Sequence, residues 1–96
     1  MRADSILQNK KECFVTHSNY DLDCHHIFFG SANRKISDRE GFWVWLRHDR
    51  HIAGSPYKTP HNDRQTDLWL KRLCQEAYEK THSREEFIQL IGRSYL

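Results

Sequence analysis

The strongest constraint on the fold is the apolar pattern in the last third of the chain. Apolar side chains recur there at steps of three and four residues, at Leu70, Leu73, Cys74, Ala77 and Tyr78. Residues at this spacing share one face of an α-helix, and Asn62 or Asp63 offers a side chain that caps its first turn. The pattern predicts the main helix of the protein over residues 62–80.

A second helix is predicted at the C-terminal end. Ser83 and Glu86 form a capping-box pattern, and Phe87, Leu90 and Ile91 then lie on one helical face. Gly92 is a typical end signal. We expect a short helix here that packs on the long one.

Strands are predicted upstream of these helices. The runs 13–15 (CFV) and 22–29 (LDCHHIFF) read as a hairpin across the turn HSNYD, and 42–46 (FWVWL) reads as a buried or half-buried strand. The segment 31–41 is expected to be a loop, in which Ser37 and Glu40 cap at most a short helical turn. Another loop, over about 53–60, is preceded at most by a single helical turn.

These elements predict one α+β domain over residues 1–96, with a small antiparallel sheet, helices on one side of it, and a flexible start over 1–10. No apolar run is long enough to span a bilayer, and the N-terminus lacks the apolar stretch of a secretory signal. We therefore expect a cytoplasmic protein. Three cysteines without a C-x-x-C pair predict neither a disulfide framework nor a four-cysteine zinc site.

Histidine is the residue type that points to chemistry. The chain has seven histidines among 96 residues, and five of them fall between positions 25 and 61. The candidates for a metal site are His25 at a strand end, His51 after the third strand and His61 at a helix start, because ligands must converge from different elements. Adjacent residues of a strand point to opposite faces, so His25 and His26 do not normally bind one ion together. One of the pair is therefore free for another role, such as a general base.

Several neighbours carry weaker predictions. His48 is an alternative ligand if a helical turn brings it onto one face with His51, whereas His17 and His82 are expected at the surface. Trp43 and Trp45 share a strand face and are expected to pack in the core, and Cys24 is expected to be a buried small side chain. The cations that flank the histidines are candidates for contacts with nucleic-acid phosphates, at Arg34, Lys35, Arg47 and Arg50. The net charge of +2 suits such a partner without requiring it.

The stretch CHHIFFGSANRKISDREGFWVWLRHDRHIAGSPYKTPHND resembles the HNH, or His-Me finger, nucleases, and in particular small phage-encoded members. The likeness follows the succession H-H, A-N-R-K, G-L-x-V-x-L, a distal H and G-V-H-x-N. With QEAYEK and FIQLIGRSYL it covers about residues 12–96. Two departures stand out: the N-terminal C-x-x-C of relatives is absent after Cys13, where His17 or Cys24 is a possible substitute ligand, and TPHND keeps His61 but lacks the glycine.

The resemblance implies a ββα-metal core and a DNA endonuclease that depends on one divalent ion: zinc, magnesium, manganese or nickel. It implies that His26 is the general base and that His25, His51 and His61 are the metal ligands. Asn33 is then a catalytic residue that orients His26, and Arg34, Lys35 and Arg50 contact DNA phosphates. The expected partner is DNA, bound either by a monomer or by a homodimer, in the host cytoplasm and away from membranes. The alternative is a non-catalytic zinc-binding adaptor for nucleic acid or protein with a degenerate HNH fold.

Overall fold

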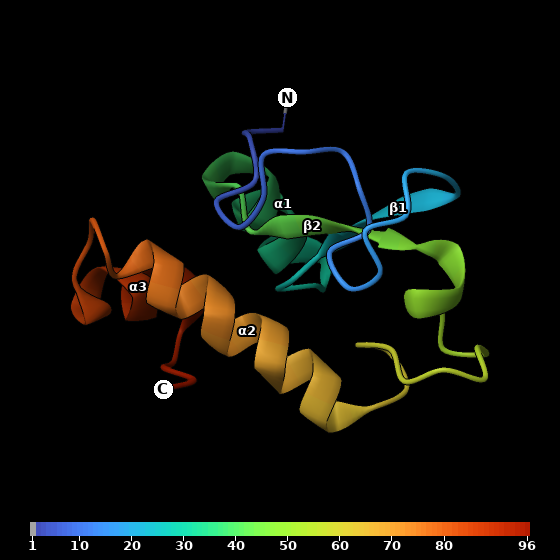
Figure 1. Ribbon diagram of the computed structural model, residues 1–96. Helices are drawn as coiled ribbons and strands as arrows, with labels where there is room; N and C mark the ends of the chain where they lie inside the picture. Colours follow the sequence, from blue (N-terminus) through green and yellow to red (C-terminus); the bar gives the residue numbers. More distant parts are fainter. Residues whose placement is uncertain (1) are drawn as a thin grey trace.

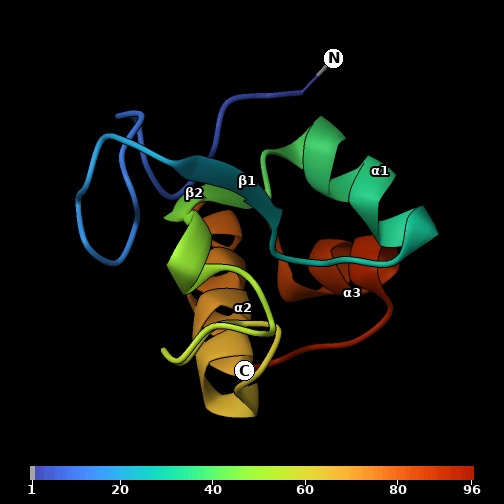
Figure 2. The same cartoon turned by 90° about the vertical axis from the view of Figure 1, so that its right-hand side faces the viewer.

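The computed structural model describes residues 2–96 as a small α+β fold (Figure 1). The elements are β1 (Leu22–His26), α1 (Ser31–Glu40), β2 (Trp43–Arg47), a 3-10 turn η1 (His48–Arg50), α2 (Arg64–Tyr78) and α3 (Arg84–Ile91). Both views show α2 on one side of the sheet and the N-terminal segment on the other, with α1 beyond the end of the strands (Figures 1 and 2). The predicted α+β class is confirmed.

The sheet consists of β1 and β2, paired antiparallel from Leu22 opposite Arg47 to His26 opposite Trp43. The predicted strand over 42–46 is thus confirmed with a shift of one residue. Facing residues of a ladder point to the same side, so His25 shares its side with Val44 and His26 shares its side with Trp43. The two adjacent histidines therefore face opposite sides of the sheet, as strand alternation requires.

The predicted strand over 13–15 is wrong. This segment forms a turn, in which the amide of His17 donates to the carbonyl of Cys13 and the amide of Cys13 donates to the carbonyl of Ser18. A single ladder-like bond joins it to the sheet, from the Phe14 amide to the Trp45 carbonyl at 2.8 Å. Burial of Cys13 and Phe14 satisfies the apolar pattern without a strand, so the partner of β1 is β2.

The loop predicted over 31–41 is also wrong, because α1 fills it with a helix of ten residues. Its only fully buried side chain is Ser37, whose hydroxyl donates to the Phe28 carbonyl at 2.8 Å. Gly41 ends the helix in the left-handed conformation, with its amide bonded to the Ser37 carbonyl. A helix that buries so little apolar surface leaves no apolar stripe in the sequence.

The two C-terminal helices match their predicted caps. Asp63 is the N-cap of α2 and accepts the Thr66 amide at 3.0 Å. Ser83 and Glu86 form the complete capping box of α3, and Gly92 ends that helix in the left-handed conformation. The η1 turn lies where a single helical turn was expected.

The segment 3–8, assigned by sequence to a flexible start, makes defined hydrogen bonds to the sheet and to α1. The Ala3 amide donates to the Asp38 carbonyl at 2.7 Å, and the Ser5 hydroxyl donates to the Trp43 carbonyl at 2.6 Å. Trp43 is buried beneath this segment, and its ring lies 5.3 Å from the half-buried ring of Trp45. The N-terminal segment therefore covers the sheet face opposite α2.

The core lies between the sheet and the helices. Phe28, Phe42 and Phe87 are fully buried, with ring centroids 5.6–6.2 Å apart, and Tyr78 completes the aromatic cluster. Among residues 2–96, none of the helices combines the length and the apolar character that crossing a membrane demands.

Candidate metal centre

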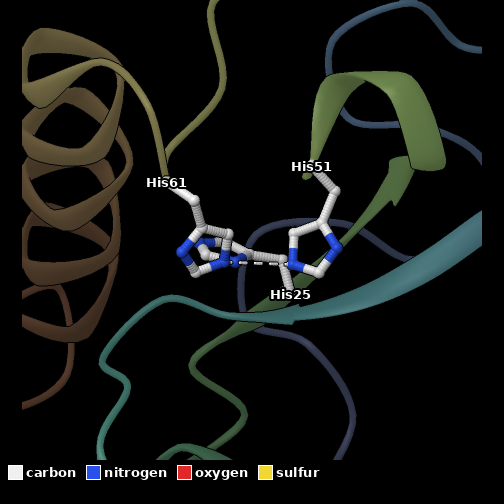
Figure 3. Close-up of side chains that lie close together, drawn as sticks. All are labelled: His25, His51 and His61. Carbon is white, nitrogen blue, oxygen red and sulfur yellow. Dashed lines mark hydrogen bonds between the residues drawn. The ribbon is translucent and has the colours of Figure 1, made fainter. Parts of the chain in front are cut away.

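The three histidines predicted as metal ligands come together in the structure. His25 comes from the end of β1, His51 follows η1, and His61 lies in the loop before α2 (Figure 3). One nitrogen from each ring lies within 4.8 Å of the others, and the ring centroids are 5.0–5.2 Å apart. Three donors from three elements leave room for a further ligand, as in catalytic rather than closed structural zinc sites.

The distance between His51 and His61 fits coordination of a single ion. Their Nε2 atoms lie 3.3 Å apart, the contact drawn as a dashed line in Figure 3. Two nitrogens at zinc–imidazole bond lengths in a tetrahedron are separated by about 3.3 Å. The same distance also allows a hydrogen bond with one shared proton, so the two rings are arranged to hold either a proton or a cation between them.

His25 provides a second test of fit. Its side chain is 1% exposed, and its Nε2 is buried without a hydrogen-bond partner. Burial lowers the pKa of His25 from 6.5 to about 3, with smaller contributions from the positive forms of His51 and His61. Burial also lowers the pKa of His61. Both imidazoles are therefore neutral at physiological pH, which is the form that binds metals.

Asp23 orients the ring of His51, a role that the sequence did not predict. Its Oδ2 accepts the Nδ1 protons of His51 at 2.9 Å and of His48 at 2.8 Å. Burial opposes ionisation of Asp23, but the hydrogen bonds from His51 and His48 outweigh it and lower the pKa of this carboxyl. With Nδ1 of His51 protonated, its Nε2 keeps a lone pair for an ion. The sequence does contain a signal for this role: Asp23 lies two residues before His25 in one strand, and this spacing places both side chains on the same face.

His48 bonds Asp23 as His51 does, but it does not belong to the group of three donors. Within the described residues no other group of three such side chains comes together, so Cys13 and Cys24 form no accessory metal site there. Cys13 is buried and Cys24 is half-buried. His17 and His82 are exposed, as expected.

His26 reaches the same cavity from the other face of β1. Its Nε2 lies 2.7 Å from Oδ1 of Asp38 on α1. The cavity has a volume of about 310 Å³, and its lining includes all four histidines together with Arg34. The structure thus joins the three donors, a half-buried histidine and a guanidinium in one cavity.

The other predicted site residues lie apart from this cavity. Asn33 and Lys35 are on α1, half-buried and exposed respectively, and neither belongs to the lining. Arg50 lies at the end of η1 with its guanidinium 3.9 Å above the ring of Tyr57. Of the four cations predicted to contact phosphate, Arg34, Lys35, Arg47 and Arg50, only Arg34 lines the cavity.

A network of hydrogen bonds within the loop before α2 holds His61 in position. Thr59 is fully buried and donates its amide to Oδ1 of Asn62 at 2.8 Å and its hydroxyl to the Ile52 carbonyl at 3.1 Å. The side-chain amide of Asn62 donates to the Tyr57 carbonyl at 2.9 Å. These bonds fix the loop TPHND around His61.

Comparisons with known proteins found no similar protein. No family model matches the chain, and neither a curated protein nor a solved structure matches it.

Proposed function

We propose that this protein is a divalent-metal-dependent endonuclease that hydrolyses DNA phosphodiester bonds. One observation carries the proposal: three imidazoles have donor nitrogens within 4.8 Å, and His26 lines the same cavity from the next position of β1. A one-metal phosphodiesterase needs such a pair of functions, a cation site with an open position and a base beside it.

The donor set indicates which ions suit the site. Its three ligands are imidazoles without a carboxylate, and imidazole favours zinc, nickel or another borderline ion, whereas magnesium requires oxygen ligands. When bound, a divalent cation supplies charge stabilisation at a phosphate oxygen and at the leaving oxygen. His25, His51 and His61 hold that ion, and Asp23 keeps His51 in the tautomer that donates its Nε2 lone pair.

His26 and Arg34 supply the other groups that hydrolysis needs. His26 accepts the proton of the attacking water, because a neutral imidazole is a suitable base near pH 7. Arg34 is exposed on α1 and lines the cavity, where its guanidinium binds a phosphate oxygen of the DNA backbone. Such a contact positions the DNA strand and does not depend on the base sequence.

The element order adds support from the resemblance to HNH nucleases. Their ββα-metal core consists of two antiparallel strands followed by a helix. Here β1 and β2 pair, α1 is inserted between them, and α2 follows directly after His61. We therefore propose that β1, β2 and the start of α2 form a core of this kind.

Plasmid cleavage tests the function. Purified protein is stripped with chelator and assayed with zinc, nickel, manganese or magnesium added singly. We expect His26→Ala to lower the rate about 10²- to 10⁴-fold while metal binding persists, as for loss of a general base. His17→Ala is the matched control, because His17 is exposed and bonded to Glu12 instead. Full activity of His26→Ala would overturn the role assigned to His26.

A second candidate is a zinc-binding adaptor without catalysis. The observation in its favour is that the three ligands belong to β1, the end of η1 and the loop before α2, so one ion would cross-link separate parts of a small fold. Tight stoichiometric zinc, unfolding by chelator and no cleavage with any ion would favour it over the nuclease.

A further inference from the structure

We propose that Asp38 is the positioning residue for His26, and that α1 serves to hold this carboxylate against the base while presenting Arg34 to the phosphate. This inference rests on the proposed nuclease function and adds to it a role for Asp38, a position to which the HNH resemblance assigns none. It assigns a role to α1, the helix that the sequence did not predict.

The contact itself defines which nitrogen of His26 is available. Nε2 of His26 lies 2.7 Å from Oδ1 of Asp38, and the two side chains are 21% and 39% exposed. An ionised carboxylate only accepts hydrogen bonds, so Nε2 carries the proton in this pair. Nδ1 therefore keeps its lone pair and is the nitrogen able to take a proton from water.

The position of Asp38 is fixed by bonds of the residues around it. The Ser37 hydroxyl donates to the Phe28 carbonyl at 2.8 Å, and the Phe42 amide donates to the Ser37 carbonyl at 2.9 Å. The Asp38 carbonyl itself accepts the Ala3 amide at 2.7 Å. These contacts join α1 to the segment after β1, to the residue before β2 and to the N-terminal segment. A carboxylate held in this way restricts the rotation of the His26 ring.

Arg34 lies one helical turn before Asp38. Residues four apart on a helix share one face, so the guanidinium and the carboxylate point to the same side of α1. Arg34 lines the cavity of the four histidines, and Asp38 contacts the histidine at its edge. One helix face therefore carries both the group that orients the base and a group that binds the substrate.

A pair that water still reaches on both sides contributes little to stability, which separates the proposal from a purely structural role. Asp38→Ala should leave the melting temperature within a few degrees of wild type. Its effect should fall on kcat instead, because the base loses its orientation while the Arg34 contact and the metal ligands stay. We expect a loss in kcat of about tenfold to a hundredfold, a part of the general-base contribution, with KM for DNA and metal affinity unchanged.

The experiment compares wild type, Asp38→Ala, Asp38→Asn and Asp38→Glu with Glu40→Ala as control. Glu40 is a carboxylate on the same helix whose partner is Arg39. Steady-state cleavage gives kcat and KM, and NMR of the metal-free protein follows the Hε2 proton of His26. We expect a protected Hε2 signal in wild type and Glu40→Ala, its loss in Asp38→Ala, and partial recovery of kcat in Asp38→Glu. Asp38→Asn keeps the size of the side chain and should lower kcat even if Asp38→Ala folds poorly.

The outcomes separate this inference from the proposed function. If wild type cleaves DNA and both Asp38→Ala and Asp38→Asn keep its kcat, or lose activity through KM alone, the role of Asp38 is overturned and the nuclease stands. An Hε2 signal that persists unchanged in Asp38→Ala also overturns it. If wild type cleaves nothing with any of the four ions, the proposed function fails and the positioning role fails with it.

Discussion

His51 donates its Nδ1 proton to Oδ2 of Asp23 over 2.9 Å, and this bond determines how the ring meets its neighbours. It turns the free Nε2 toward Nε2 of His61, 3.3 Å away. Asp38 makes the equivalent contact with His26 on the opposite face of β1. Two carboxylates thus orient two histidines with different proposed roles, one toward a metal and the other toward water.

Asp23→Ala should weaken metal binding. Loss of the carboxylate frees the His51 ring to rotate and to change tautomer, so we expect the affinity for zinc to fall about 10- to 100-fold. Competition against a coloured chelator measures this. His48→Ala is the control, because it removes the other partner of Asp23 and leaves the His51 bond in place. Equal affinity of Asp23→Ala and wild type would refute the orienting role.

Metal should stabilise the fold by joining β1 to the loop before α2. A ligand at a hundred times its dissociation constant raises the free energy of unfolding by about 2.7 kcal/mol, which is a shift in Tm of roughly 10–20 °C for a domain of this size. Thermal melts with zinc and with chelator measure the difference. His61→Ala removes an exposed ligand and should lose most of the shift, whereas His48→Ala should keep it. A shift that survives in His61→Ala would place the ion elsewhere.

Glu86 should make the stability of α3 depend on pH in the acid range. The hydrogen bond from the Ser83 amide is the largest cause that lowers the pKa of this carboxyl below 4.5, and burial opposes it. Since the folded-state pKa is lowered, the stabilisation is complete above the unfolded value of 4.5 and is lost as the pH falls through the folded value. Glu86→Gln retains an acceptor for the cap and removes the titration.

Melting curves followed by circular dichroism between pH 6 and pH 3 check this. We expect wild type to lose more Tm across that range than Glu86→Gln, with Glu85→Gln, an exposed neighbour in the same turn, behaving like wild type. Parallel curves for wild type and Glu86→Gln would contradict the assignment.

The features predicted correctly from the sequence are those that depend on residues close together in the chain. Asp63, Ser83 with Glu86, and Gly92 are short-range signals: α2 begins at the first, α3 begins at the second, and α3 ends at the third. The grouping of His25, His51 and His61 was also predicted, because each lies at an element boundary and strand alternation turns His25 away from His26.

What the sequence did not predict depends on contacts between distant segments. The helix α1 is fixed by the Ser37–Phe28 bond and by the N-terminal segment, and neither contact leaves a periodic apolar pattern. Asp38 was missed with its helix. Cys13 and Phe14 of the apolar run 13–15 pack against the core from a turn, as they could from a strand, so the apolar residues alone favoured the wrong alternative.

Gly41→Ala should detach the N-terminal segment from the sheet. Gly41 has φ of 77°, and a Cβ atom there would lie 2.1 Å from the backbone carbonyl oxygen of Asp4. The left-handed backbone alone costs a residue with a side chain about 1–2 kcal/mol, and the collision adds to this because a backbone atom cannot rotate away. The Ile6 amide, which donates to the Gly41 carbonyl at 3.0 Å, should then exchange its hydrogen faster.

Gly54→Ala is the matched control, since a Cβ atom at Gly54 meets nothing within 4 Å. Amide exchange followed by NMR distinguishes the two variants, and unchanged protection of Ile6 in Gly41→Ala would mean that residues 3–8 are held by other contacts.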